Sequence, residues 1–119
     1  MATELFPIIA TADMGRSLGF YRDLLGGTVS YEFAGPDGAP AYVGLDLGTS
    51  HLGIGHDPAA AAAGRSVSLW IYTEEVDATI ERLRGAGVAI LDEPRDQPWG
   101  ERVAMVEDPD GIHVHVATR

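Results

Sequence analysis

The sequence has 119 residues, of which 45% are hydrophobic and 22% charged, and this length fits a single domain. It contains no cysteine, which excludes structural disulfides, thiolate metal sites and a cysteine nucleophile. The net charge of −10 disfavours nucleic acid and anionic membrane surfaces as partners and favours cationic or neutral ligands. No apolar run is long enough to span a bilayer, and the N-terminus lacks the basic region and apolar run of a signal peptide. We therefore expect a cytoplasmic protein.

The first half of the chain predicts a strand, a helix and three further strands. Residues 5–10 form the first predicted strand, and residues 14–25 form an amphipathic helix. Asp13 is its expected N-cap, and Gly26-Gly27 ends it. The apolar stripe of this helix consists of Met14, Leu18, Tyr21 and Leu25. The three strands that follow are predicted at residues 29–33, 41–47 and 51–55.

The second half repeats this order of elements. Its helix is predicted at residues 74–84, with Thr73 as the N-cap. Its strands are predicted at residues 67–72, 89–91, 103–107 and 113–117. The sequence therefore predicts one domain, residues 1–119, made of two βαβββ modules at about 4–57 and 65–118. An alanine-rich stretch at residues 59–63 joins the two modules.

Alternation of side chains along each strand predicts which residues face away from the helices. In residues 67–72, Val67, Leu69 and Ile71 form the apolar set. Trp70 and Tyr72 then face the other way, although Trp70 could instead fill the core. Aromatic, histidine and glycine residues on such faces are typical of a ligand-binding surface. The predicted ligand-binding residues are Phe6, Phe33, Tyr42, His51, Trp70, Tyr72, Trp99, His113 and His115.

Two groups of motifs carry a resemblance to a known family. Asp13 precedes a helix that contains Phe20-Tyr21 and Leu25-Gly26, and Gln97-Pro98-Trp99-Gly100 precedes Asp108-Pro109-Asp110-Gly111. In this order, over essentially the whole chain, they resemble the vicinal oxygen chelate superfamily, which includes glyoxalase I, extradiol dioxygenases, and fosfomycin and bleomycin resistance proteins. The bleomycin-resistance branch is the most similar. The resemblance implies an α+β fold, with paired βαβββ modules forming a curved mixed sheet with outer helices, and a homodimer.

The resemblance also implies where a metal ion would be held. The family's ligand positions fall on Phe6, Gly53, Ser68 and His115. Only His115 can ligate, whereas a catalytic divalent ion usually has three protein ligands. We therefore expect no metal and no cofactor. A displaced site remains an alternative, and its candidate ligands are Asp46, His51, Glu107, His113 and His115.

These observations predict a binding protein rather than an enzyme, with no catalytic residue. Its ligand would be a planar or cationic natural product, such as a bleomycin-type antibiotic, which the protein sequesters and thereby confers antibiotic resistance. Aromatic contacts with a flat ligand contribute about 0.5–1.5 kcal/mol each beyond the area they bury. One alternative is a metal-dependent lyase, isomerase or dioxygenase with a non-standard site around His115. Another is a metal-free enzyme that uses His113 or His115 as a general acid–base.

Overall fold

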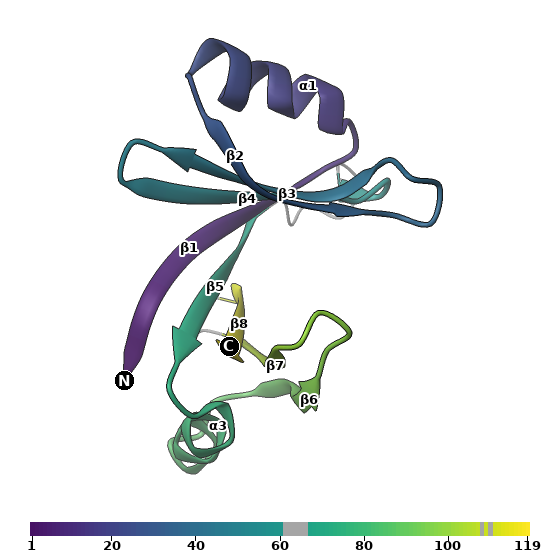
Figure 1. The fold of residues 1–119 in the computed structure, drawn as a ribbon. Helices are drawn as coiled ribbons and strands as arrows, with labels where there is room; N and C mark the ends of the chain where they lie inside the picture. The colour runs from purple at the N-terminus through teal and green to yellow at the C-terminus, as the bar shows by residue number, and fades with distance from the viewer. Residues whose placement is uncertain (61–66, 108, 110) are drawn as a thin grey trace. The chain divides into compact units, whose positions relative to one another are not determined.

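A strand, a helix and three further strands occur in the same order twice along the chain, as the sequence predicts (Figure 1). The computed structural model describes residues 1–60, 67–107, 109 and 111–119. These residues form two units, an N-terminal unit of Phe6–Val67 and a C-terminal unit of Met1–Leu5 with Ser68–Arg119. The predicted linker at 59–63 and the turn at 108–111 fall partly outside the described residues.

The N-terminal unit is built on four strands in the order β2-β3-β4-β1. They are β1 (Ala2–Thr11), of which residues 6–11 belong to this unit, β2 (Thr28–Ala34), β3 (Pro40–Leu47) and β4 (Ser50–His56). Strands β1 and β4 pair in parallel, whereas β2–β3 and β3–β4 are antiparallel. The pairing is therefore mixed, as predicted.

One face of this sheet packs against α1 (Met14–Leu18). The N-cap prediction is confirmed, since the Asp13 Oδ1 atom accepts a hydrogen bond of 3.0 Å from the backbone N–H of Arg16. The buried cluster under the helix consists of Leu18, Val43, Leu45, Leu52 and Ile54. Alternate residues of β3 and β4 thus face the helix, as the strand pattern predicts.

The first helix differs from the prediction after Leu18. Residues Gly19–Leu24 form a π-helical segment, η1, and the Leu25 N–H donates to the Phe20 carbonyl oxygen, five residues back, at 3.0 Å. Because each such bond spans one residue more than in an α-helix, the apolar stripe rotates away from the core. Met14 and Tyr21 still pack against the buried cluster, but Leu25 is 55% exposed. The prediction that Leu25 belongs to the buried stripe is therefore wrong.

The C-terminal unit has the strand order β5-β8-β7-β6. Its strands are β5 (Val67–Thr73), β6 (Ile90–Asp96), β7 (Arg102–Glu107) and β8 (His113–Thr118). Strand β6 is longer than predicted and contains Pro94. An edge strand tolerates proline, and the β6–β7 register shifts between Asp92 and Arg95, around that residue. The buried cluster against α3 (Val76–Gly85) consists of Val76, Ile80, Ala104, Val106 and Val116.

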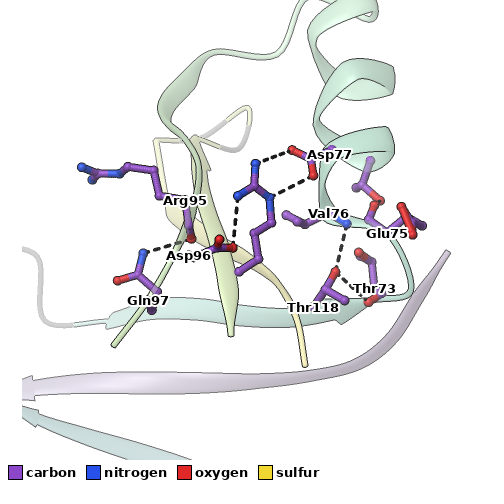
Figure 2. A network of polar contacts seen from close by, with 10 residues as sticks. Thr73, Glu75, Val76, Asp77, Arg95, Asp96, Gln97 and Thr118 are labelled. Atoms are coloured by element: carbon purple, nitrogen blue, oxygen red, sulfur yellow. Dashed lines mark hydrogen bonds and ion pairs between the residues drawn. The ribbon is translucent and has the colours of Figure 1, made fainter. Parts of the chain in front are cut away.

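A residue distant in sequence caps helix α3. The predicted cap, Thr73, lies within β5, and its hydroxyl is buried without a hydrogen-bond partner among the described residues. Instead, the Thr118 Oγ1 atom on β8 accepts from the Val76 N–H at 2.9 Å and donates to the Thr73 carbonyl oxygen at 3.3 Å (Figure 2). The last strand therefore stabilises the start of α3, and the prediction of Thr73 as the cap is wrong.

An arginine on β7 also ties α3 to the sheet. The Arg102 guanidinium donates to both carboxylate oxygens of Asp77 on α3, at 2.9 and 3.1 Å, and to Asp96 at 3.1 Å (Figure 2). These pairs are exposed, so each contributes little to stability. They connect α3 to β7 and to the end of β6.

Substituting Thr118→Val should lower the free energy of unfolding by about 1 kcal/mol, because it removes a helix cap at nearly constant volume. Chemical denaturation followed by circular dichroism measures this. Thr28→Val, at an exposed position on β2, is the control and should change stability little. Equal stabilities of Thr118→Val and the unmodified protein would show that this cap is not needed.

Candidate functional site

In the N-terminal unit, the sheet face opposite α1 carries a group of rings, here called the His51 cluster. Its members are Phe6, Tyr31, Tyr42 and His51. The Phe6 and His51 rings meet edge to face, with centroids 4.6 Å apart, and the Tyr31 and Tyr42 centroids are 6.1 Å apart. Phe6, Tyr42 and His51 are predicted binding residues, and the structure places all three on this face. Tyr31 was not among the predicted binding residues.

Two glycines make room for these rings. Gly44 on β3 and Gly53 on β4 are directly paired across the strands. A Cβ atom built on Gly53 would overlap the Tyr42 hydroxyl, and one built on Gly44 would lie 3.1 Å from His51 Cε1. The Tyr42 and His51 rings therefore lie over the glycine pair, in space that side chains at positions 44 and 53 would fill.

A carboxylate holds the imidazole of His51 from the neighbouring strand. The Asp46 Oδ1 atom lies 2.9 Å from His51 Nδ1, and the two residues are cross-strand partners. The Asp46 side chain is more than half exposed, whereas that of His51 is 28% exposed. Phe33, another predicted binding residue, is paired with Tyr42 and is 46% exposed. It lies at the exposed margin of the same face.

Substituting Gly53→Ala should destabilise the protein by about 1–3 kcal/mol, because the added methyl group displaces the Tyr42 ring from its packed position. Gly55→Ala is the matched control on the same strand face, since a Cβ atom there meets nothing within 4 Å. Thermal or chemical unfolding of both variants measures the difference. If both variants were equally stable, Tyr42 would not be confined by Gly53.

In the C-terminal unit, a second group of rings, the Trp70 cluster, lies around β5, β8 and the loop before β7. It comprises Trp70, Tyr72, Trp99 and His115. The Trp70 and His115 rings stack, with centroids 5.1 Å apart and planes 23° apart, because these residues are parallel-strand partners. The ring centroids of Trp70 and Tyr72 are 6.2 Å apart. All four are predicted binding residues, and they are brought together here.

Glu101 joins two members of the Trp70 cluster. One carboxylate oxygen accepts from the Tyr72 hydroxyl and the other from the Trp99 indole N–H, each at 2.7 Å. Burial, with the hydrogen bond to this carboxylate, raises the pKa of Tyr72 to about 12. No local pattern distinguishes Glu101 from the other charged residues at strand ends. Its position two residues after Trp99 was the available signal.

A cation already lies against this cluster. The Arg119 guanidinium carbon lies 3.7 Å from the centre of the Tyr72 ring, the geometry of a cation–π contact. Arg119 also donates to Glu4 at 3.3 Å. The surroundings of Tyr72 therefore combine aromatic faces with the carboxylates of Glu4 and Glu101.

The two histidines of β8 lie at different positions relative to this cluster. His113 is partnered with Glu107 on β7, and His115 with Met105 on β7 and Trp70 on β5. Burial, together with the nearby charge of His113, lowers the pKa of His115 below its ordinary value of 6.5. The folded protein therefore keeps His115 neutral under conditions in which the unfolded chain takes up a proton.

This pKa shift makes stability depend on pH. As the pH falls below 6.5, the unfolded state binds a proton that the folded state resists, so the free energy of unfolding should fall until the folded pKa is reached. The variant His115→Phe should lose the pH dependence that His115 contributes. The difference in unfolding free energy between this variant and the unmodified protein should therefore change as the pH falls below 6.5. His56→Gln, at an exposed position, is the control. Denaturant unfolding at several pH values measures the stability of both variants. Parallel pH profiles for His115→Phe and the unmodified protein would contradict the lowered pKa of His115.

The residues present do not fit the metal site that the resemblance locates. Phe6 packs on His51, position 53 has no room for a side chain, and His115 stacks on Trp70. Asp46 and His51 lie together in one unit, and Glu107 is paired with His113 in the other. Among the described residues, no three His, Asp or Glu side chains gather as a set of ligands.

A shallow hollow lies elsewhere, at the start of α3. Its lining includes Glu74, Asp77, Asp96, Arg102 and Arg119, and it contains none of the predicted ring residues. Within this lining, Arg102 bonds to Asp77 and Asp96, whereas Arg119 bonds to Glu4 outside it. No helix in the described part of the chain is long and apolar enough to cross a membrane.

Comparisons with known proteins agree with this fold. A family model described as the Glyoxalase/Bleomycin resistance protein/Dioxygenase superfamily matches residues 5–116. An uncharacterised protein of Mycobacterium tuberculosis is 25% identical across 92% of this chain and 70% of its own length.

Solved structures extend the comparison. A member of the same superfamily from Vibrio splendidus has a TM-score of 0.78 and 20% identity, and the match covers 100% of both chains. A variant of Streptomyces coelicolor methylmalonyl-CoA epimerase, in complex with 2-nitronate-propionyl-CoA, has a TM-score of 0.77 and 26% identity. That match covers 99% of this chain and 98% of the epimerase.

Proposed function

The chain belongs to the glyoxalase/bleomycin resistance protein/dioxygenase superfamily, and we propose that within it this protein binds small molecules without a metal ion. Its ligand is a planar or cationic natural product, such as a bleomycin-type antibiotic, which it sequesters. Sequestration breaks no covalent bond and needs no metal, which accords with the single metal-capable residue at the family's four ligand positions. The physiological result is resistance to the sequestered compound.

The anchored indole of Trp99 is the observation that carries this proposal. Its N–H is fixed by Glu101 at 2.7 Å, yet the residue is 46% exposed. A large aromatic ring held in one orientation at the surface loses little entropy when it stacks on a flat ligand. Trp70, Tyr72 and His115 extend the same aromatic surface within the C-terminal unit.

Charge supports a cationic ligand. Arg119 already occupies a cation–π position over Tyr72, with Glu4 as its partner. The net charge of −10 adds a long-range attraction for cations, which salt weakens. The same charge opposes polyanions.

Binding is tested by titrating the protein with metal-free bleomycin and with proflavine, a planar cation, while tryptophan fluorescence is recorded. We expect quenching, and we expect Trp99→Ala and Trp70→Ala each to weaken affinity by about two- to tenfold, the loss of one aromatic contact. Phe20→Ala, an exposed aromatic residue of η1, is the control. The proposal fails if neither probe changes the fluorescence, or if all three variants bind like the unmodified protein.

A second candidate is an enzyme, because the 26% identity to methylmalonyl-CoA epimerase extends over 99% of this chain. This second candidate includes a metal-dependent lyase, isomerase or dioxygenase with a non-standard metal site around His115. Incubation with methylmalonyl-CoA in deuterated water, together with metal analysis of protein purified without chelator, distinguishes it. Exchange of the substrate's α-proton, or a stoichiometric transition metal lost in His115→Ala, would replace the binding proposal.

We extend the proposal to a homodimer located in the cytoplasm. Strand β2 is an edge strand, and its Val29, Tyr31 and Phe33 are 40–48% exposed. An exposed apolar edge of this kind is suited to contact with a second copy. Light scattering at several protein concentrations reports the assembly state.

A further inference from the structure

The Asp46–His51 pair fixes which nitrogen of the imidazole is free to accept a hydrogen bond. An ionised carboxylate can only accept, so His51 Nδ1, 2.9 Å from Asp46 Oδ1, must carry the proton that it donates. In the neutral imidazole the other nitrogen, Nε2, then holds a lone pair. Asp46 therefore acts as a positioning residue, and His51 becomes an acceptor with a defined direction.

The direction of Nε2 follows from the glycine pair. A Cβ atom built on Gly44 would lie 3.3 Å from Nε2, so this nitrogen lies over Gly44, on the ring-bearing face. Phe6 packs edge-on against the imidazole and limits its rotation. The acceptor is thus held on three sides by Asp46, Phe6 and the backbone at Gly44.

The imidazole is partly exposed and lies on the same face as an exposed aromatic ring. The His51 side chain is 28% exposed, and Tyr31, which is paired with Gly44, is 48% exposed. A flat ligand could therefore lie against the Tyr31 ring while an N–H group reaches Nε2. The exposed carboxylate of Asp46 lies directly behind the imidazole and favours a positive charge on that ligand.

We propose that Asp46, His51 and Tyr31 form a recognition site for planar cations that carry N–H donors, such as amidines and protonated nitrogen heterocycles. His51 Nε2 accepts the hydrogen bond, Asp46 fixes the tautomer, and Tyr31 provides the stacking surface. This inference rests on the proposed binding function and names its ligand class. It goes further because it requires an N–H donor on the ligand, whereas binding by aromatic stacking alone requires none.

The tautomer is tested without any ligand. Nitrogen-15 spectra of the labelled protein in mildly alkaline buffer distinguish protonated from unprotonated ring nitrogens, and His51→Phe identifies the His51 signals among the four histidines. We expect Nδ1 to be protonated and Nε2 unprotonated. In Asp46→Asn this preference should weaken. A His51 ring with its proton on Nε2 in the unmodified protein would overturn the inference.

Donor recognition is tested with two aromatic monocations. Benzamidine carries N–H donors, whereas phenyltrimethylammonium carries none. We expect His51→Phe, which keeps an aromatic ring but removes the acceptor, to weaken benzamidine binding about fivefold, the worth of one hydrogen bond. Binding of phenyltrimethylammonium should be unaffected. His56→Phe, at an exposed position on the same strand, is the matched control and should leave both affinities unchanged.

The outcomes separate this inference from the proposed function. Equal losses for the two probes in His51→Phe, no loss for benzamidine, or no binding of either probe would each overturn the inference. The proposed function is judged independently, by bleomycin and proflavine binding and by the tryptophan variants of the C-terminal unit. Quenching by proflavine without donor selectivity at His51 would leave the binding function standing and remove this ligand class.

Discussion

The absence of two side chains shapes the ring-bearing face of the N-terminal unit. Gly44 and Gly53 are paired across β3 and β4, and the rings of His51 and Tyr42 occupy the space above them. Strand alternation puts the aliphatic residues of the same strands under α1, so one face is a packed core and the other a set of rings. A side chain at either glycine would compete with these rings. The spacing of small and large residues thus determines where the rings lie on this face.

The C-terminal unit reaches a similar arrangement by a different physical means. There the rings are fixed by hydrogen bonds, since the Glu101 carboxylate accepts from both Tyr72 and Trp99. Because this carboxylate accepts from the Tyr72 hydroxyl and the Trp99 N–H, it lies at the edges of both rings. This combination of fixed rings and a carboxylate supports the proposal of a cationic, planar ligand.

Membership of the superfamily is compatible with several functions, whereas the residues at the expected metal-ligand positions favour one of them. The fold is shared with metal-dependent enzymes and with binding proteins, so the fold alone does not select a function. At this chain's family positions, Phe6 and Gly53 support or accommodate rings, and His115 stacks on an indole. The positions that the resemblance identifies with metal ligands serve aromatic packing here, which supports the proposed binding function.

Much of this molecule was predictable from local patterns. The βαβββ repeat, the Asp13 cap and the two faces of β4 follow from periodicity and turn residues, because these depend on neighbours close in sequence. The resemblance in the opening and closing motifs added the family, which the match over residues 5–116 confirmed. The grouping of Trp70, Tyr72 and His115 was predictable as a shared face, though their mutual distances were not.

Contacts between residues distant in sequence were decided only by the tertiary structure. Thr118 caps α3 from 42 residues away, and Glu101 reaches Tyr72 across 29 residues. The π-helical turn after Leu18 turned Leu25 outward, which an α-helical period does not anticipate. A sequence determines which side chains share a strand face or a helix stripe, since backbone geometry fixes that locally. Which polar atoms of different strands come within hydrogen-bond distance depends on the register and packing of the whole unit.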